Sequence, residues 1–529
     1  MEWSYLEKLK SIVINFVMLN KDLDIVIQDG NLYYKNNVIY IKESFDKVEF
    51  TVKSCTLPKV KDDYPKIIIK INESTNLIKH FMYFLMNIKR IGLMVLQKEN
   101  VTFYFNYNDS KGNNIKTDKT IKRIKTNGSL FNDLNETLIF LGEGCIISEN
   151  NGSATVVNRG DSNIEGFGYD FNEEDASLKA KLEYLERYAA SLKLEETISD
   201  CYTNISKSAI NPIKLGVYSN SQCIQQNLSI YSNSLVIDWV KGQSLVSGEY
   251  LLIPEQYVQY LVPNIKNRFI YESSNGCAVG NTFEEASLFS ILEVVERDVF
   301  MNFWFSKDKA TRIDINVEPK LSKKVQYFND LGYTLDFFYI NNGLNIHVVW
   351  GLLRSNNIHN YFYSITGLGC HLKLQHAIEA AFKEIYNVFI GFEKNKFLIE
   401  KKIQSIKSGI ISNLEDHLYY FASFDSMEII EDKINILENV DVDDLKINNF
   451  MSIDISDELQ YVVKNLSKKY TDILIVDQTN NYLKAFSLNC TKAILIGSAP
   501  LDFTSDLIRL QNNEVTNVRK AYRNIHPLA

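Results

Sequence analysis

The chain has 529 residues, which is more than one hydrophobic core usually supports, so we expect two or more domains. Hydrophobic residues make up 45% of it and charged residues 23%, a balance that excludes a disordered or fibrous protein. The net charge of −8 argues against a protein that works mainly by binding nucleic acid.

The N-terminal sequence carries no targeting signal that we recognise. The apolar run SIVINFVML leads into KDLD without a small-residue cleavage site, so it predicts a buried helix. No stretch is long and apolar enough to predict a membrane span. The seven cysteines are scattered and form no CxxC pair, which is typical of reduced thiols and of a cytoplasmic protein.

Residues 1–155 are predicted to form a separate, small α/β module. Two β-prone runs flank the turn signal at Asp29 and Gly30, and TNLIKHFMYFLMNIKRIGLMVL predicts a helix that leads into a strand. The polar stretch at 148–163 predicts the boundary with a second domain, residues 156–529.

A group of basic residues lies within this module: Lys116, Lys119, Lys122, Arg123 and Lys125. Such a group can dock an acidic partner or peptide, but a solvated loop or helix face is the more frequent arrangement. We assign it no functional role.

Two related acidic segments follow, EDASLKAKLEYLER at 174–187 and EEASLFSILEVVER at 284–297. At 100° per residue, the second predicts a helix without a broad polar face, so the helix should be largely buried. The carboxylates of Glu285, Glu293 and Glu296 are then buried with it. A buried carboxylate must be neutralised by protonation, a cation or a metal.

The first segment repeats this pattern, with Asp175, Glu183, Glu186 and Arg187 in the corresponding positions. One ExxER on a helix is usually a surface Glu–Arg pair. Two copies in register predict instead that the acids face one cavity. Hard divalent cations suit such a site, and several Mg²⁺ ions bridging a nucleoside triphosphate are the simplest interpretation.

Other candidate motifs are weaker. The chain has no GxxxxGK[ST] loop and no HExxH pair. Cys370 and His371 are adjacent on a predicted turn, which we interpret as a backbone-positioning loop. We interpret Cys277 as a small packed residue and not as a nucleophile.

Four segments, in this order, resemble the YcaO family. They are GFGYDFNEEDASLKAKLEYLERYAAS from Gly166, WVKGQSLVSGEYLLIPEQYV from Trp239, SSNGCAVGNTFEEASLFSILEVVERD from Ser273 and GLGCHLKLQHAIEAAFKEIYN from Gly367. The ordered set is more specific than any one segment. It covers the chain from about residue 160 onward and is similar to the SagD-like branch, which acts with peptide-modifying partners.

The resemblance implies an α/β (α+β) fold in which β-sheets and helices surround a Mg-ATP pocket. It implies ATP-dependent cyclodehydration of Cys, Ser or Thr in a ribosomally made precursor peptide, as in bacteriocin or thiopeptide maturation. The amide oxygen is phosphorylated, and a thiazoline or oxazoline results. A ThiF-like leader-peptide-binding partner, a flavin-dependent azoline dehydrogenase and a homodimer are also implied. The N-terminal module would be the docking site of such a partner.

The resemblance also assigns roles by position. Mg²⁺ is assigned to Glu183, Glu186, Glu293, Glu296 and Glu384. The nucleotide is assigned to these residues and to Lys179, Arg187, Asn281, Glu285 and Arg297. A C-terminal tail in the active site makes His526, Pro527 and Ala529 candidate catalytic residues, with His526 as a proton-transfer group, although a lone tail histidine is more often incidental.

Four positions depart from the family pattern: Phe167 for a lysine, Lys179 for a serine, Ala380 for an arginine and Asn387 for a glutamine. Lys179 lies on the acidic face of its helix, where it either restores a phosphate contact or neutralises a pocket that has lost ATP. Two classes therefore stay open, an azoline-forming enzyme and a YcaO-like scaffold without ATP turnover. Thioamide formation is an alternative within the enzyme class.

Overall fold

The protein is described from a computed structural model. It describes residues 164–502, apart from gaps at 171–172, 195, 261, 263–264, 315–318, 407–410, 442–447, 481–482 and 485, and also residues 504, 507–509 and 525–528. Before residue 164 it describes the strands β1 to β9, residues 114–116 and the helical positions 12, 77, 80, 81 and 84.

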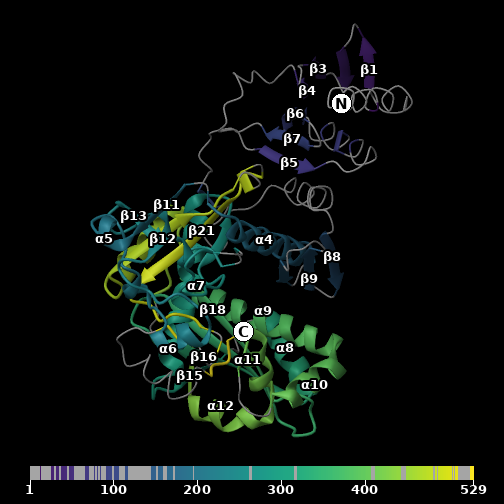
Figure 1. The fold of residues 1–529 in the computed structure, drawn as a ribbon. Coiled ribbons are helices and arrows are strands. Elements are labelled where there is room, and N and C mark those ends of the chain that lie inside the picture. The colour runs from purple at the N-terminus through teal and green to yellow at the C-terminus, as the bar shows by residue number, and fades with distance from the viewer. Residues whose placement is uncertain are drawn as a thin grey trace.

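An antiparallel sheet in the order β1-β2-β3-β4-β6-β7-β5 forms the N-terminal part of the described chain (Figure 1). Pairing of β1 with β2 across positions 29–30 confirms the predicted strand pair. Phe81, at a helical position, packs against Phe50 of β4, so helical residues cover this sheet. The strands are β1 (Ile25–Gln28), β2 (Asn31–Tyr34), β3 (Asn37–Glu43), β4 (Lys47–Val52), β5 (Lys66–Lys70), β6 (Ile91–Gln97) and β7 (Asn100–Phe105).

A second, three-stranded antiparallel sheet joins β8 (Cys145–Asn150), β9 (Ser153–Asn158) and β10 (Glu165–Tyr169). Helix α4 (Glu173–Ser191) packs on its β9 and β10 strands. The boundary predicted at residue 155 lies within β9. The division of the chain into 1–155 and 156–529 stays a prediction.

Residues 114–116 contact a segment far along the chain. The Lys116 N–H donates to the Ile453 carbonyl at 2.8 Å, and the Ile455 N–H donates to the Asn114 carbonyl at 3.0 Å. Lys116 is 1% exposed, and its Nζ lies 2.7 Å from Glu458 Oε1. The prediction of a solvated face is therefore wrong for Lys116, because this lysine is buried in an ion pair with Glu458. The other four basic residues of that group lie outside the described residues.

Two further sheets, of six and five strands, lie in the rest of the described chain. One is antiparallel, in the order β11-β12-β20-β21-β14 with β13 paired to β12; the other, β18-β17-β16-β15-β19, has one parallel pair, β15 with β19. The strands are β11 (Thr197–Cys201), β12 (Val236–Ser244), β13 (Tyr250–Pro254), β14 (Cys277–Gly280), β15 (Ala310–Asp314), β16 (Tyr333–Ile340), β17 (His347–Ser355), β18 (Ser364–His371), β19 (Ile434–Asp441), β20 (Asp472–Asp477) and β21 (Asn489–Ile496).

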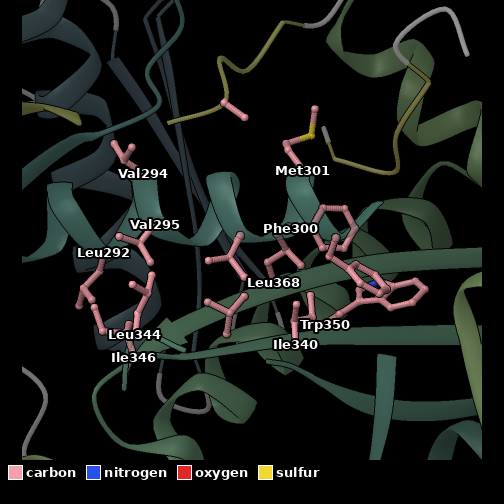
Figure 2. Packing of buried hydrophobic residues seen from close by; sticks show 14 of the residues in the cluster. Leu292, Val294, Val295, Phe300, Met301, Ile340, Leu344, Ile346, Trp350 and Leu368 are labelled. Atoms are coloured by element: carbon pink, nitrogen blue, oxygen red, sulfur yellow. The ribbon is translucent and has the colours of Figure 1, made fainter. Parts of the chain in front are cut away.

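Helices cover both faces of the sheet β18-β17-β16-β15-β19. Its strand β17 shows why. Alternate side chains of a strand point to opposite faces. Trp350 and Leu352 pack with α7 (Phe283–Trp304), and Val349 and Leu353 pack with α9 (Leu374–Lys394). Figure 2 shows the α7 side of this core, where Trp350 lies beneath Phe300. A strand buried on both faces needs a continuous apolar run, and the sequence has VVWGLL here.

Shorter helices complete the fold. They are α5 (Tyr202–Ile205), α6 (Asn220–Gln225), α8 (Pro319–Asp330), α10 (Lys396–Ser405), α11 (Leu414–Ala422), α12 (Met427–Lys433) and α13 (Ile455–Leu466), with 3₁₀ turns η1 (Pro212–Leu215), η2 (Glu255–Tyr257) and η3 (Phe424–Ser426). Among the helices in the described part of the chain, none has both the length and the apolar character that crossing a bilayer requires. The predicted mixed α/β class is confirmed.

Candidate active site

Three strand–helix units surround the acidic residues: β10 with α4, β14 with α7, and β18 with α9. Each helix packs on the strand that precedes it, and each also contacts the strand of another unit. Helix α4 contacts β14, α7 contacts β18, and α9 contacts β10, so the units close into a ring. These units lie in three of the four segments that resemble the YcaO family, those from Gly166, Ser273 and Gly367.

Two glycines allow β10 to lie directly on α4. A Cβ added at Gly166 would lie 2.1 Å from the Ala180 carbonyl oxygen, and one at Gly168 would lie 2.2 Å from that of Ala176. Real Cβ atoms do not approach backbone so closely, so any other residue would push the strand away. The GFG sequence is thus required by backbone packing.

The unit of β18 and α9 repeats this arrangement, which the sequence reasoning missed. Cβ atoms at Gly367 and Gly369 would lie 2.4 Å and 1.9 Å from the carbonyl oxygens of Ala381 and Ala377. The residues Gly367, Gly369, Ala377, Ala381 and Glu384 have the same spacing as Gly166, Gly168, Ala176, Ala180 and Glu183. That shared spacing was the available signal.

Equivalent hydrogen bonds hold the glutamates of these two units. The Phe167 N–H donates to Glu183 Oε2 at 2.5 Å, and the Leu368 N–H donates to Glu384 Oε2 at 2.7 Å. In each case the donor is the residue between the two glycines. The strands therefore orient both carboxylates, and burial raises the pKa of Glu183 against the opposing effect of Arg187.

Helix α7 begins with residues that hold one another. The Thr282 Oγ1 accepts from the Glu285 N–H, and both the backbone and side-chain amides of Asn281 donate to Glu285 Oε2 at 2.7 and 2.9 Å. Glu285 is fully buried, whereas Asp175, its predicted counterpart on α4, is exposed. The repeat between the two acidic helices therefore does not extend to this position.

Further along α7, backbone amides again hold the acids. The Gly276 N–H donates to Glu293 and the Cys370 N–H donates to Glu296. Cys370 and His371 lie in strand β18, so the prediction of a turn or loop there is wrong, and it is a strand amide that holds Glu296. Glu296 is 8% exposed and Glu293 is half-buried, so the predicted burial of this helix is confirmed.

Burial also controls the charge of these carboxylates. It raises the pKa of Glu293 to about 7 and that of Glu296 to about 8, although Arg297 opposes both shifts. Arg297 lies 3.3 Å from Glu296 and 3.9 Å from Glu384, which belongs to the next unit. Lys492 also lowers the pKa of Glu293, but these two cations face three acids, so the site favours an added cation.

The donor set fits Mg²⁺ in its chemistry. Carboxylate oxygens are the ligands that Mg²⁺ prefers, and it usually takes one or two of them together with phosphate oxygens and water. Within the described residues, no group of three or more His, Cys, Asp or Glu is already arranged to hold a metal. The carboxylates of Glu183 and Glu296 are instead paired with Arg187 and Arg297. The assignment of Mg²⁺ to these acids stays a prediction.

Glu186 lies beside the strands β14 and β21. It is among the charges that raise the pKa of Cys277 and Cys490, after burial itself, and it acts on Tyr260 in the same way. Burial likewise raises the pKa of Cys370. These thiols stay protonated at neutral pH, which fits packed residues better than nucleophiles.

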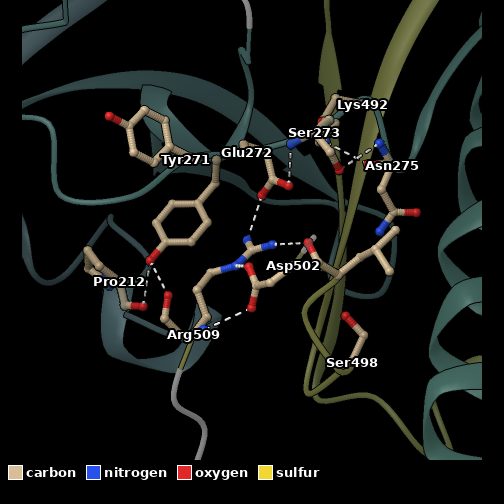
Figure 3. Close-up of polar contacts among 12 residues, drawn as sticks. Pro212, Tyr271, Glu272, Ser273, Asn275, Lys492, Ser498, Asp502 and Arg509 are labelled. Carbon is tan, nitrogen blue, oxygen red and sulfur yellow. Dashed lines mark hydrogen bonds and ion pairs between the residues drawn. The ribbon is translucent and has the colours of Figure 1, made fainter. Parts of the chain in front are cut away.

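Lys492 holds the turn that presents Gly276 (Figure 3). Its Nζ donates to the carbonyl oxygens of Ser273 at 3.1 Å and Asn275 at 2.6 Å. Gly276 has a φ of +81°, and a Cβ there would lie 2.8 Å from the Ala493 carbonyl oxygen, so only glycine fits. The sequence reasoning missed this lysine, which comes more than 200 positions after the turn it supports.

The cavity beside this turn is a separate feature. Asn275, Lys492, Glu272 and Arg509 line it. Arg509 pairs with Asp502 at 2.7 Å and with Glu272 at 2.8 Å, so the charges there are already matched (Figure 3). Glu183, Glu296 and Glu384 are not among its lining residues, and we do not assign the nucleotide to it.

The C-terminal tail packs at the far end of α7. His526 is fully buried and stacks on His417, with its Nε2 3.1 Å from the Asp502 carbonyl oxygen. Trp304 Nε1 donates to the Ile525 carbonyl. Trp304 follows Glu296 by eight residues, or about 12 Å along the helix. The described tail is thus anchored away from the acids, and the catalytic role of His526 stays a prediction.

The catalytic roles of Pro527 and Ala529 also stay predictions. Pro527 is buried with His526, and Ala529 lies outside the described residues.

Comparison with known proteins identifies this ring of units. The model of the family described as YcaO cyclodehydratase, ATP- and Mg²⁺-binding, matches residues 167–495. The chain belongs to the YcaO family. The predicted family is confirmed, and with it ATP and Mg²⁺ as the cofactors of that family. A search of the curated proteins finds no match.

Solved structures of two heterocyclases and of a YcaO protein share the fold. A heterocyclase in complex with substrate and cofactor has a TM-score of 0.62 at 16% identity over 81% of this chain and 63% of that one. The heterocyclase TruD has a TM-score of 0.50 at 18% identity, over 86% of this chain and 63% of that one. YcaO from Methanopyrus kandleri, bound with AMPPCP and Mg²⁺, has 0.54 at 14% identity over 74% and 96%. The chain thus spans 63% of the length of the two heterocyclases, and these identities show the fold alone.

Proposed function

We propose that this YcaO chain is the ATP-dependent cyclodehydratase subunit of a peptide-maturation complex. It would convert Cys, Ser or Thr residues of a ribosomally made precursor peptide to thiazolines or oxazolines. The observation that supports this most directly is the convergence of acids from three units. Glu183, Glu293 and Glu296 are each close enough to Glu384 for its charge to raise their pKa.

Phosphoryl transfer from ATP requires that the reacting groups are held in position and that the phosphate charge is neutralised. The side-chain oxygen or sulfur attacks the preceding carbonyl carbon and loses its proton, and the carbonyl oxygen takes the terminal phosphoryl group of ATP with ADP as the leaving group. Loss of phosphate and of the amide proton leaves the C=N bond. Mg²⁺ on the acids would neutralise the phosphate charge. Backbone amides of the three units hold the acids in fixed positions for this purpose.

Partners follow from the same proposal. A ThiF-like protein would bind the leader of the precursor, and a flavin-dependent dehydrogenase would oxidise the azoline. Residues 1–155 are the proposed docking region. A homodimer, a cytoplasmic location, the SagD-like branch and bacteriocin or thiopeptide maturation belong to this proposal as well.

Titration of the purified chain with ATP, with and without Mg²⁺, tests the nucleotide site. We expect Mg²⁺-dependent binding that Glu296→Ala abolishes. Glu428→Ala, which removes an exposed glutamate of α12, is the matched control and should bind as the wild type does. No binding by the wild type, even with the ThiF-like partner present, would overturn the enzyme proposal.

The alternative is a YcaO scaffold without ATP turnover. One observation favours it: Phe167, where a lysine is usual, is 41% exposed and contributes no charge, and Arg187 lies 5.7 Å from its ring. Mass spectrometry of the treated precursor separates the classes. Loss of one water per ring indicates azolines, exchange of oxygen for sulfur indicates a thioamide, and an unchanged mass with ATP unbound indicates the scaffold.

A further inference from the structure

Two lysines from different units meet at one carboxylate. Lys179 of α4 and Lys383 of α9 both bind Asp170 Oδ2, at 2.5 Å and 2.7 Å. Asp170 follows the end of β10 directly. The contact therefore joins the first unit to the third, at the same junction where α9 packs on β10.

These ammonium groups lie next to the acids already described. Lys179 precedes Glu183 by one helical turn, about 5.4 Å, on the same face of α4. Strand β10 contacts both, because the Phe167 N–H donates to Glu183 and the Tyr169 carbonyl accepts from Lys179 at 3.2 Å. Lys383 reaches the end of the same strand from α9, through Asp170. A basic group thus borders the acidic group along one strand.

Two ammonium groups share one carboxylate oxygen here, and each ammonium carries three donors. The Lys179 side chain is 44% exposed, so a ligand can approach it from solvent. Burial raises the pKa of Asp170, but Lys179 and then Lys383 outweigh that effect and bring it to about 2. Asp170 therefore stays ionised and holds both lysines.

An anion that also carries divalent cations fits these neighbouring groups. Its metal-bearing oxygens would face the carboxylates, and its remaining oxygens would face the ammonium groups. A nucleoside triphosphate has this distribution, whereas a monophosphate is too short to use both ends.

We propose that Lys179 and Lys383, held together by Asp170, bind the terminal phosphate groups of the nucleotide, with Asp170 as a positioning residue. This inference rests on the proposed function of the same site. Of these three residues, only Lys179 was assigned to the nucleotide from the sequence. Lys383 and Asp170, and the joining of two units through them, come from the structure.

The test compares binding of Mg-ATP and of AMP to the purified full chain. We expect Lys179→Met/Lys383→Met to weaken Mg-ATP about 100-fold, or about tenfold for each lost charge-assisted contact, while AMP affinity stays the same. The single variant Lys179→Met, at a largely exposed side chain, guards against misfolding of the double variant. Lys193→Met is the matched control. Lys193 follows the end of α4, is exposed, and likewise pairs with an aspartate, Asp238.

The outcomes separate this inference from the proposed function. Wild-type binding of Mg-ATP together with an unchanged ratio of ATP to AMP affinity in the lysine variants would overturn the lysine site alone. Absence of Mg-ATP binding by the wild type would overturn both. A loss of ATP affinity in Lys193→Met equal to that in Lys179→Met would show a general charge effect and would also count against the site.

Discussion

Helices α4 and α7 contain the same ExxER sequence in different surroundings. On α4, Arg187 pairs at 2.7 Å with Glu183 one turn earlier, and the two side chains are 28% and 31% exposed. On α7, Arg297 is less exposed, and it pairs with Glu296 and, across the ring, with Glu384. One pattern thus produces a local pair in one unit and a bridge between units in the other, because burial decides how far a charge acts.

The largest expected difference comes from removing each arginine. Arg297→Ala should lower the free energy of unfolding by about 3 to 5 kcal/mol, because it leaves buried carboxylates without their cation. Arg187→Ala should cost about 0.5 kcal/mol, as for an i,i+4 pair that water screens. Urea unfolding without Mg²⁺ measures both. Equal losses would mean that the two helices are equivalent after all.

The glycines test whether α9 is the structural counterpart of α4. Gly369→Ala should cost about 3 kcal/mol, because its Cβ would lie 1.9 Å from the Ala377 carbonyl oxygen, and Gly168→Ala should cost a similar amount. Gly391 lies on the same α9 helix with nothing within 4 Å of its added Cβ. Gly391→Ala should therefore stabilise by about 0.5 to 1 kcal/mol. A tolerated Gly369→Ala would contradict the close packing.

The pH dependence of stability separates α7 further. The pKa of Glu296 is raised from 4.5 to about 8, so the folded state keeps a proton that the unfolded state loses between these values. Stability without Mg²⁺ should therefore fall as pH rises through this window. Glu296→Gln should reduce the fall, and Glu293, whose pKa is raised to about 7, should account for part of what remains. Glu428→Gln should leave the slope unchanged.

Asp170 should show the opposite dependence with a smaller amplitude. Its pKa is lowered from 3.8 to about 2, so its contribution is present above pH 3.8 and is lost as pH falls through 2. Asp170→Asn should cost about 1 kcal/mol at pH 7, since the carboxylate is only partly buried, and much less at pH 2, where the carboxyl is half protonated. Acid titration of unfolding checks this, and an equal cost at both pH values would contradict the two-lysine contact.

The sequence predicted those parts of the site that depend on local patterns. The absence of a polar face on 284–297 was enough to predict a buried helix, and α7 has buried acids as expected. The spacing shared by GFG with Glu183 and by GLG with Glu384 was also visible, but only the acidic repeat of α4 and α7 was compared. That repeat fails at one position, because Asp175 is exposed where Glu285 is buried.

The contacts that the sequence did not predict join residues far apart along the chain. Lys383 meets Asp170 across 213 positions, and Lys116 meets Glu458 across 342. The sequence around each of these residues carries no signal of the distant contact. A surface position was the reasonable expectation for a lysine.

By itself, then, the sequence determined the helix and strand periods, the burial of α7 and the family, because each depends on residues close together or on an ordered set of motifs. Only the tertiary structure decided which acids share a cation, which lysines reach the site and where the tail packs. The physical reason is that charges interact through space and through the local dielectric, and neither their separation nor their burial can be read from spacing along the chain.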